Sequence, residues 1–340
     1  MLLQILFIYI IPQIGKISIN ATMILQIMAK YDTLPSGDVM RKRLTGILSI
    51  LIATLFWGST FVAQSVGMDH IGPFTFQAVR CGIGVISMLP MILVSDRLKR
   101  DDKTFFSRWN DKKLWKAGIL CGIPLFLACN LQQMGIVDTD AGKSGFLTAM
   151  YIVIVPIIGI FLKKKPSVMI PVSVILAVVG LYFLSFAGVP QITKGDILLL
   201  ACAFMFAVQI TVVDHYVSSV DALRLNLIQA LVCCILSGIV MLLTETVTAR
   251  TLLDCWLPLC YAGILSMGVA YSLQIIGQKH LEPSAASLIM SLESVFAVLS
   301  GWLILNERMS NSEVLGCALV FAAVILSQIT IKPRKKEVSI

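Results

Sequence analysis

Long apolar runs separated by short polar connections make up most of the chain. Ten runs reach or approach the roughly 20 residues with which a helix crosses the ~30 Å hydrocarbon core of a bilayer. A segment in lipid must satisfy its own backbone hydrogen bonds, so each run is predicted to be a helix. The sequence therefore predicts an all-α integral membrane protein. The ten predicted spans are residues 44–66, 72–94, 117–136, 141–162, 168–187, 196–213, 225–243, 256–276, 284–305 and 313–331.

Composition supports the same class. Hydrophobic residues make up 57% of the chain and charged residues 14%, whereas a soluble domain carries about 25% charged residues. These values exclude a water-soluble enzyme, a disordered chain and a secreted disulfide scaffold. The nine cysteines lie almost entirely in apolar runs and the three histidines form no cluster. We therefore interpret the cysteines as packing residues and expect no metal and no cofactor.

Basic residues lie in clusters beside the apolar runs, where they act as topology signals. If residue 41 is placed in the cytoplasm, twenty Lys and Arg fall on the cytoplasmic side and four on the other. This asymmetry predicts that both ends of a ten-span chain are cytoplasmic. It also argues against nucleic acid as a partner, and leaves the lipid bilayer and a small-molecule substrate. The sequence leaves open whether the protein is a monomer or a dimer.

The first 40 residues stand apart from the rest. Residues 1–12 are apolar but too short to span comfortably, and no convincing cleavage site follows. Met40 is followed at once by Arg41, Lys42 and Arg43 and then by the first span, as at a native cytoplasmic start. Two hypotheses stay open. Residues 1–40 are either an upstream translation extension, which is not native, or a surface segment.

The chain resembles itself at an offset near 143 residues. Residues 144–167 align with residues 287–310, and both are small-residue helices that end in a charged turn and a Ser. A repeat of five spans is odd, so the second copy enters the membrane inverted. We predict repeats at 41–190 and 191–332, followed by a cytoplasmic tail at 333–340. Inverted repeats are typical of secondary transporters, whose site lies near the bilayer midplane at the repeat interface.

Three motifs in register then resemble a known family. They are Phe56–Val62 (FWGSTFV), Ala141–Thr148 with the downstream Pro156, and Ser291–Ala297 with the downstream Glu307. Together they resemble the EamA-type permeases of the drug/metabolite transporter superfamily over about residues 41–332. The resemblance implies a bacterial inner-membrane permease, often an exporter of amino acids or related metabolites. The family usually has Pro where this chain has Ser294, which puts a helix break at that point in doubt.

Two ionisable residues lie deep inside predicted spans, where charge is costly and indicates function. Glu293 is near the middle of the ninth span. It could pair with a substrate ammonium, carry a proton, or bond a neighbouring helix. Arg80 lies nine residues into the second span. Its long side chain could snorkel to the interface in a structural role, which we favour, or could contact substrate.

Uncharged polar and aromatic residues extend the candidate site. They occupy faces of the first, third, fourth, sixth and eighth spans. Each could simply bond helix to helix, but a convergence from several helices would suit a small zwitterion or polar metabolite. These candidates are Trp57, Thr60, Gln64, Asn130, Gln133, Thr148, Tyr151, Gln209, Tyr271 and Gln274.

We therefore predict an alternating-access carrier of a small organic solute. A carrier of phosphorylated or nucleotide-linked solutes would need several basic residues in the cavity, and only Arg80 and Lys143 are candidates. An integral membrane enzyme acting on lipid would need a nucleophile–base pair or metal ligands. The sequence contains neither H-E-x-x-H nor G-x-S-x-G. Among these hypotheses the carrier accounts best for Glu293 and the repeat.

Overall fold

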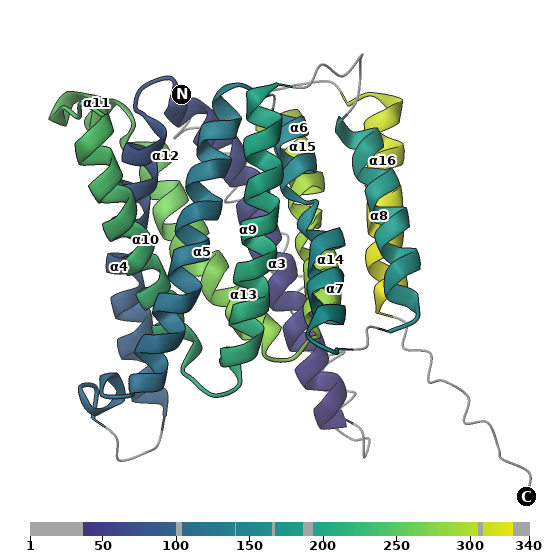
Figure 1. Ribbon diagram of the computed structural model, residues 1–340, viewed down its shortest axis with the longest axis horizontal. Coiled ribbons are helices and arrows are strands. Elements are labelled where there is room, and N and C mark those ends of the chain that lie inside the picture. The colour runs from purple at the N-terminus through teal and green to yellow at the C-terminus, as the bar shows by residue number, and fades with distance from the viewer. Residues whose placement is uncertain are drawn as a thin grey trace, which may run out of the picture.

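The structure, a computed structural model, describes residues 37–99, 104–139, 141–164, 167–185, 193–304 and 309–328. All secondary structure in these ranges is helical. The helices stand side by side in one bundle (Figure 1). The hypotheses about residues 1–40 fall almost wholly outside the described residues and stay predictions. So do the predicted tail and the downstream Glu307.

The first half of the bundle contains α3 (Gly37–Met68), α4 (Pro73–Leu98), η2 (Ser107–Trp109), α5 (Lys112–Val137), α6 (Ala141–Thr148), α7 (Tyr151–Phe161) and α8 (Met169–Ser185). The second half contains α9 (Lys194–Val217), α10 (Ala222–Thr244), α11 (Ala249–Asp254), α12 (Trp256–Tyr261), the π-helical segment η3 (Ala262–Ala270), α13 (Tyr271–Gln278), α14 (Pro283–Met290), α15 (Leu292–Ile304) and α16 (Asn311–Ser327).

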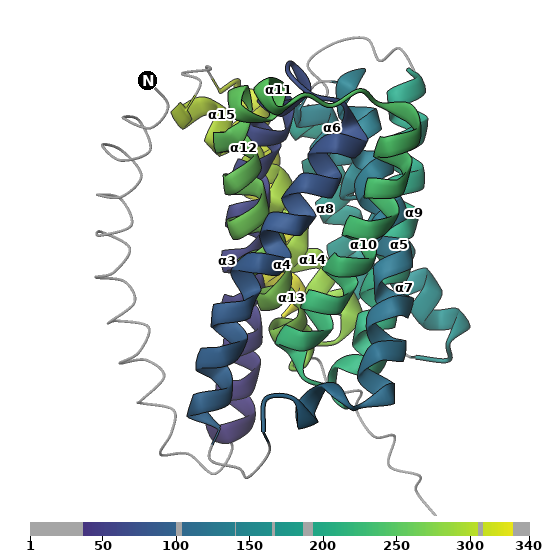
Figure 2. The same ribbon diagram turned by 90° about the vertical axis from the view of Figure 1, so that its left-hand side faces the viewer.

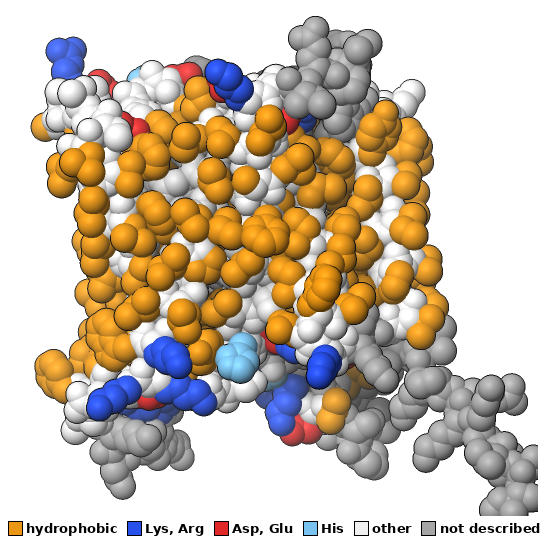
Figure 3. All heavy atoms as spheres, in the orientation of Figure 1, with side chains coloured by type: hydrophobic (Ala, Val, Ile, Leu, Met, Phe, Trp, Pro, Cys, Tyr) orange, Lys and Arg blue, Asp and Glu red, His pale blue; other side chains and the backbone are white. Residues whose placement is uncertain are grey.

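Among the described residues, each of the ten predicted spans overlaps with one to three consecutive helices, the eighth with α12, η3 and α13. Eight stretches among the described residues are long and apolar enough to cross a bilayer. The two others are α8 and α16, of 17 residues each, so the predicted count of ten is not fully confirmed. Figure 3 shows apolar side chains over the middle of the visible face, with Lys and Arg gathered mainly at its lower edge.

Two predicted spans are interrupted near their middle. The fourth divides into α6 and α7 at Ala149–Met150, and the ninth into α14 and α15 at Ser291. At both breaks the backbone changes to bonds between residues three apart: the N–H of Ile152 donates to the Ala149 oxygen (3.0 Å) and that of Ser294 to the Ser291 oxygen (3.2 Å). The sequence predicted unbroken helices here. The break in the ninth span precedes Ser294, so it forms without the proline that the family usually has.

Close helix contacts rest on glycines, as is usual in lipid-embedded bundles. A Cβ placed on Gly316 of α16 would lie 2.6 Å from the backbone oxygen of Gly180 in α8. The α8–α16 pair forms one side of the bundle (Figure 1), and Figure 2, seen from the opposite side, shows α4 and α10 in front. At its centre, a Cβ on Gly58 of α3 would lie 2.7 Å from the backbone oxygen of Glu293. These contacts bring α3 directly against α15.

Candidate functional site

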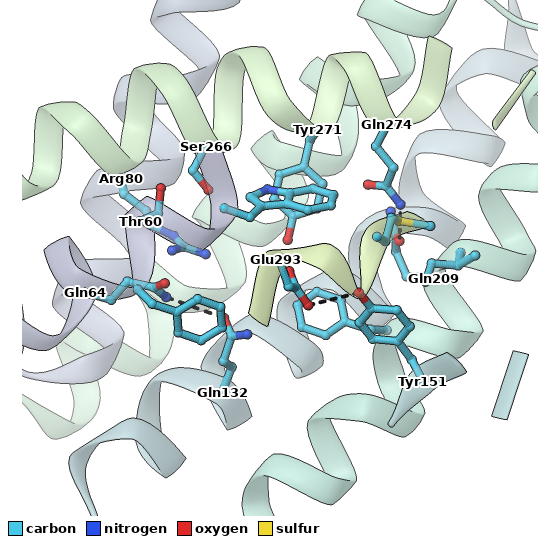
Figure 4. Close-up of a pocket in the computed structure, with 15 residues that line it drawn as sticks. Thr60, Gln64, Arg80, Gln132, Tyr151, Gln209, Ser266, Tyr271, Gln274 and Glu293 are labelled. Carbon is cyan, nitrogen blue, oxygen red and sulfur yellow. Dashed lines mark hydrogen bonds between the residues drawn. The ribbon is translucent and has the colours of Figure 1, made fainter. Parts of the chain in front are cut away.

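A polar cavity lies in the middle of the bundle, enclosed by helices from both halves of the chain (Figure 4). About 40 Å³ of it is free for the centres of water molecules, where one water needs roughly 10–15 Å³. The cavity thus has room for a few waters or one compact solute group in this conformation. Its lining consists of Trp57, Thr60, Phe61, Gln64, Arg80, Gln132, Tyr151, Phe206, Gln209, Ile210, Ser266, Tyr271, Gln274, Met290 and Glu293.

Nine of the twelve residues singled out in the sequence line this cavity. They come from α3, α4, α7, α9, α13 and α15, so residues far apart in the chain meet at one place. The nine are Trp57, Thr60, Gln64, Arg80, Tyr151, Gln209, Tyr271, Gln274 and Glu293.

The other three lie behind the cavity wall or away from it. The Gln133 side-chain oxygen accepts a hydrogen bond from Gln64 Nε2 (2.8 Å) and so holds that amide. The Thr148 hydroxyl accepts from Gln132 Nε2 (3.4 Å). Asn130 donates to Ser237 of α10 (2.8 Å) and joins two helices, which is the structural role that intramembrane amides often have.

Sequence reasoning missed Gln132 and Ser266, which also line the cavity. A signal for Gln132 existed: Leu125, Cys129 and Ile136 are buried and share its face at helical spacing. Asn130 and Gln133 form a more conspicuous polar pair in the same span. Ser266 had no comparable signal, because it lies in the π-helical segment η3, where wider turns change which residues share a face.

Glu293 occupies the centre of the site beside the break between α14 and α15. Its side chain is buried, at 6% exposure. Glu293 Oε1 accepts a hydrogen bond from the Tyr151 hydroxyl (3.0 Å), and Tyr151 is the first residue of α7 after the other break. Ser294 Oγ donates to the Gly145 oxygen of α6 (2.9 Å). The two interrupted helices are thus joined at the cavity.

Arg80 is the basic residue in the cavity lining. It is 2% exposed, so it does not snorkel to the interface as the favoured interpretation of the sequence held. Figure 4 shows its side chain pointing into the cavity from α4. The Nε atom has no hydrogen-bond partner among the described residues. No ion pair joins Arg80 to Glu293 or to any other described residue.

An aromatic pair forms a further part of the wall. The rings of Trp57 and Tyr271 meet edge to face, with centroids 5.0 Å apart. The Tyr271 hydroxyl lies 3.5 Å from Cys129 Sγ. Trp57 Nε1 is buried without a hydrogen-bond partner among the described residues. This wall offers apolar contact with a single unused donor.

A bridge of amides separates the cavity from a cleft at the basic end, which is the end of the bundle where Lys and Arg gather (Figure 3). Gln274 Nε2 donates to Gln209 Oε1 (3.2 Å) and to Gln278 Oε1 (3.0 Å), and Gln278 Nε2 donates to the Ile210 oxygen (3.0 Å). Beyond Gln278 the cleft has a volume of about 570 Å³ on the same measure as the cavity. An ion pair between Lys164 and Asp214 lies on its wall.

Within the described ranges, no group of three or more His, Cys, Asp or Glu is placed to hold a metal ion. The chemistry that the described cavity offers is recognition: one guanidinium, one carboxyl group, several amides and hydroxyls, and an aromatic wall. Buried charge in the middle of a membrane bundle, at the interface of two repeats, is the arrangement of a solute-binding site in a transporter.

The fold and this site define a multi-pass membrane transporter. The sequence matches the EamA-like transporter family twice, over residues 44–186 and 193–328. The chain therefore belongs to the EamA-like transporter family, in agreement with the resemblance found in its motifs.

Similar proteins carry the same description. An "Uncharacterized transporter" of Archaeoglobus fulgidus is 33% identical over 288 residues, which cover 84% of this chain and 86% of that protein. The "Uncharacterized transporter YoaV" of Bacillus subtilis is 24% identical and is covered completely, with 87% of this chain. One solved crystal structure superposes with a TM-score of 0.64 at 19% identity, over 83% of this chain and 96% of that one. At that identity the crystal structure supports the fold alone.

Proposed function

We propose that this transporter moves a small polar metabolite, such as an amino acid or a related compound, by alternating access. The observation that carries the proposal is the mid-bundle cavity, which places a cation and an acid among amides and aromatic rings. Isolated ionisable groups at this depth are expensive and default to a role in transport. A compact zwitterion or polar solute satisfies such a lining better than a lipid chain does.

Glu293 has the central role in the proposal. Its carboxyl group, held by the Tyr151 hydroxyl at 3.0 Å, is placed to pair with a substrate ammonium or to take up a proton. The amides of Gln64 and Gln209 are fixed by bonds to Gln133 and Gln229. They offer a preorganised polar wall, which lowers the entropy lost on binding.

Alternating access follows from what lies on either side of the cavity. Towards the basic end, the amide bridge at Gln278 is followed by the open cleft. Towards the opposite end, Phe61, Ile136 and Ala297 pack together as an apolar cluster. We propose that the halves rock so that the bridge and the apolar cluster open in turn, as in other inverted-repeat carriers. The basic end faces the cytoplasm of a bacterial inner membrane in this proposal.

The experiment is uptake of a mixture of the twenty radiolabelled amino acids into proteoliposomes. We expect saturable flux, and we expect Glu293→Gln to lower it at least tenfold, equivalent to about 1.4 kcal/mol of lost interaction. Asp254→Asn serves as the matched control, because it removes an exposed acid outside the cavity. Unchanged flux in Glu293→Gln would remove Glu293 from the mechanism. No saturable flux for any amino acid would contradict this substrate class.

The alternative, a carrier of phosphorylated solutes, loses one of its two basic candidates. Lys143 lies outside the cavity lining and its Nζ is 2.6 Å from the Asp196 carboxylate at the end opposite the basic clusters. Arg80 is then the basic residue left in the described lining. One guanidinium is a poor match for a doubly charged phosphate group, which usually draws several basic residues.

A further inference from the structure

Among the described residues, two buried hydrogen-bond donors of the cavity lining have no partner. They are Arg80 Nε on α4 and Trp57 Nε1 on α3, and both atoms are buried. A buried donor that loses its water without gaining an acceptor costs about 1–3 kcal/mol, and more when it is charged. Two such donors beside one cavity indicate that the missing acceptor comes from a ligand.

The cost is largest for Arg80, whose guanidinium stays protonated in proteins. The fold normally pairs such a group. Arg224, at 1% exposure, donates from both terminal nitrogens to the two carboxylate oxygens of Asp96, although its Nε, like that of Arg80, has no partner among the described residues. Arg80 is as deeply buried and has no carboxylate in ion-pair contact among the described residues. Burying an unpaired charge is strongly unfavourable, so the lining at this point favours an anionic group of a ligand.

Among the described residues, no carboxylate lies in ion-pair contact with Arg80. The titratable groups that face it are Cys81, Cys129, Cys233 and Tyr271. These are a phenol and three thiols in an apolar setting, which are neutral in their ordinary state. Glu293 lines the same cavity but accepts its hydrogen bond from Tyr151, on the other side. Figure 4 shows the hydrogen-bonded pair of Glu293 and Tyr151, with Tyr151 on the side of Glu293 away from Arg80.

The unused acceptor lies elsewhere in the cavity. Gln274 Oε1 is buried and has no hydrogen-bond partner in the described part of the chain, while Gln274 Nε2 donates to Gln209. The cavity lining therefore combines the unused donors of Arg80 and Trp57 with the unused Gln274 oxygen and the Glu293 carboxyl group, and Arg80 and Gln274 lie on opposite sides of Glu293 (Figure 4). A ligand that fits has an acceptor at its first end and a donor at its second.

We propose that the cavity recognises solutes by a carboxylate group, which Arg80 and the indole N–H of Trp57 bind together. The planar guanidinium matches the two carboxylate oxygens in geometry, which gives stronger bonds than a neutral donor. A donor on the same solute, such as an ammonium, then faces Glu293 and the Gln274 oxygen. The inference rests on the proposed transport function and assigns Arg80 and Trp57 as the residues that set its substrate class.

The experiment compares ligands that differ only in this group. Thermal unfolding of the purified full-length protein is recorded with each of the twenty amino acids, with its amide, and with the amine that lacks the carboxyl group. Inorganic phosphate and sulfate form separate arms, which distinguish a carboxylate site from a general oxyanion site. We expect at least one amino acid to raise the melting temperature at concentrations where its amide and amine do not, because only a ligand that binds the folded state stabilises it.

Two variants then test the assigned residues. Arg80→Gln should weaken binding of the amino acid at least tenfold, and Trp57→Phe, which keeps an aromatic ring but loses the N–H, by about threefold or more. Without ligand, Arg80→Gln should melt at the wild-type temperature or above it, because it removes an unpaired buried charge. Lys112→Gln, which removes an exposed cation of α5, should change neither quantity. Should Arg80→Gln fail to fold, Arg80→Lys is the second variant. It keeps the positive charge but loses the planar guanidinium, and it should still weaken binding.

Three results would overturn the inference: a wild-type protein that binds the amide or amine as tightly as the acid, no carboxylate that binds at all, or an Arg80→Gln variant with unchanged affinity. Saturable, Glu293-dependent flux of amines alone would overturn the carboxylate assignment and leave the transport proposal intact. Arg80-dependent binding of a carboxylate without flux of any solute would support the carboxylate assignment and contradict the transport proposal.

Discussion

At the scale of the residue, two buried arginines have opposite surroundings. Arg224 lies in the first turn of α10, at the basic end of the bundle. The rings of Phe105 and Trp109 face its guanidinium at 5.6 and 5.2 Å, and the Asp96 and Asp221 carboxylates pair with it. Arg80 has neither an ion-pair partner nor a facing aromatic ring of this kind among the described residues. Equal burial with opposite pairing separates a structural arginine from one that is available to a ligand.

The network around Arg224 gives a pH-dependent prediction. Asp221 caps α10 by accepting from the Arg224 N–H (3.0 Å) and also binds Lys99 (2.5 Å). Burial alone would raise the pKa of Asp221, but the bond to Lys99 and the nearby Arg224 hold it below its ordinary 3.8. A carboxylate with a lowered pKa stabilises the folded state above its unfolded pKa, and this stability is lost as the pH falls through the folded pKa.

Asp221→Asn keeps a capping oxygen and removes the charge. We expect the variant to melt below wild type at pH 7, with about 0.5–1 kcal/mol of stability lost for this partly exposed group. The difference should stay constant down to about pH 5 and shrink below 3.8, where the unfolded wild-type carboxyl is itself neutral. Melting curves between pH 3 and pH 8 measure it. A gap that does not change with pH would contradict the charge-based account.

Residue type predicted much of the cavity lining, because polar side chains within an apolar span face the interior of the bundle and not the lipid. Trp57, Gln209 and Tyr271 come from three helices and line one cavity. Pattern alone could not separate them from Asn130, since an amide that ties two helices and one that faces a cavity have the same spacing. The direction in which Arg80 points also depends on neighbours that no sequence window contains.

At the scale of the element, the helix breaks were the main feature that the sequence did not predict. Both form where turns tighten to three-residue bonds, at Ala149 and Ser291, without a proline at the break itself. A hydropathy profile does not reveal these breaks, because a broken helix and a continuous helix contain the same apolar residues. The breaks matter because they place Tyr151 and Glu293 next to each other.

The contact of α3 with α15 gives the prediction at this scale. A Cβ at Gly58 would lie 2.5 Å from the Phe296 Cβ, so one helix must move. Gly58→Ala should cost about 1–3 kcal/mol of unfolding free energy and should distort the cavity. Gly238→Ala is the matched control, since its Cβ meets nothing within 4 Å. It should change stability by at most about 1 kcal/mol, in the stabilising direction. Equal effects of the two substitutions would contradict the close packing.

At the scale of the whole molecule, the predicted all-α membrane fold is confirmed, and each of the ten predicted spans overlaps with helix within the described ranges. Period and length of apolar runs suffice for this, because lipid leaves the backbone almost no alternative to helix. What they leave undecided is whether the 17-residue helices α8 and α16 cross completely. At 1.5 Å per residue each spans about 26 Å, slightly less than a typical ~30 Å hydrocarbon core.

We expect α8 to cross, with local thinning of the bilayer making up the difference. Lys163 and Lys194 flank α8 and are exposed, so cysteines placed there report its two ends. Lys163→Cys should react with an impermeant thiol reagent added from the cytoplasmic side, and Lys194→Cys with the same reagent added from the other side. Reaction of both from one side would show that α8 does not span and would reduce the count of spans.

The central claim is that the cavity between the two halves is reached from each side of the membrane in turn. Thr60 lines the cavity at 1% exposure, and Thr60→Cys puts a single thiol in place of its hydroxyl and methyl groups. The native cysteines are mostly buried, so the wild-type protein supplies the background. The account predicts that an impermeant thiol reagent labels Thr60→Cys from either side, more slowly when substrate is bound. Labelling from one side alone under all conditions would make the cavity a blind pocket and would contradict the account.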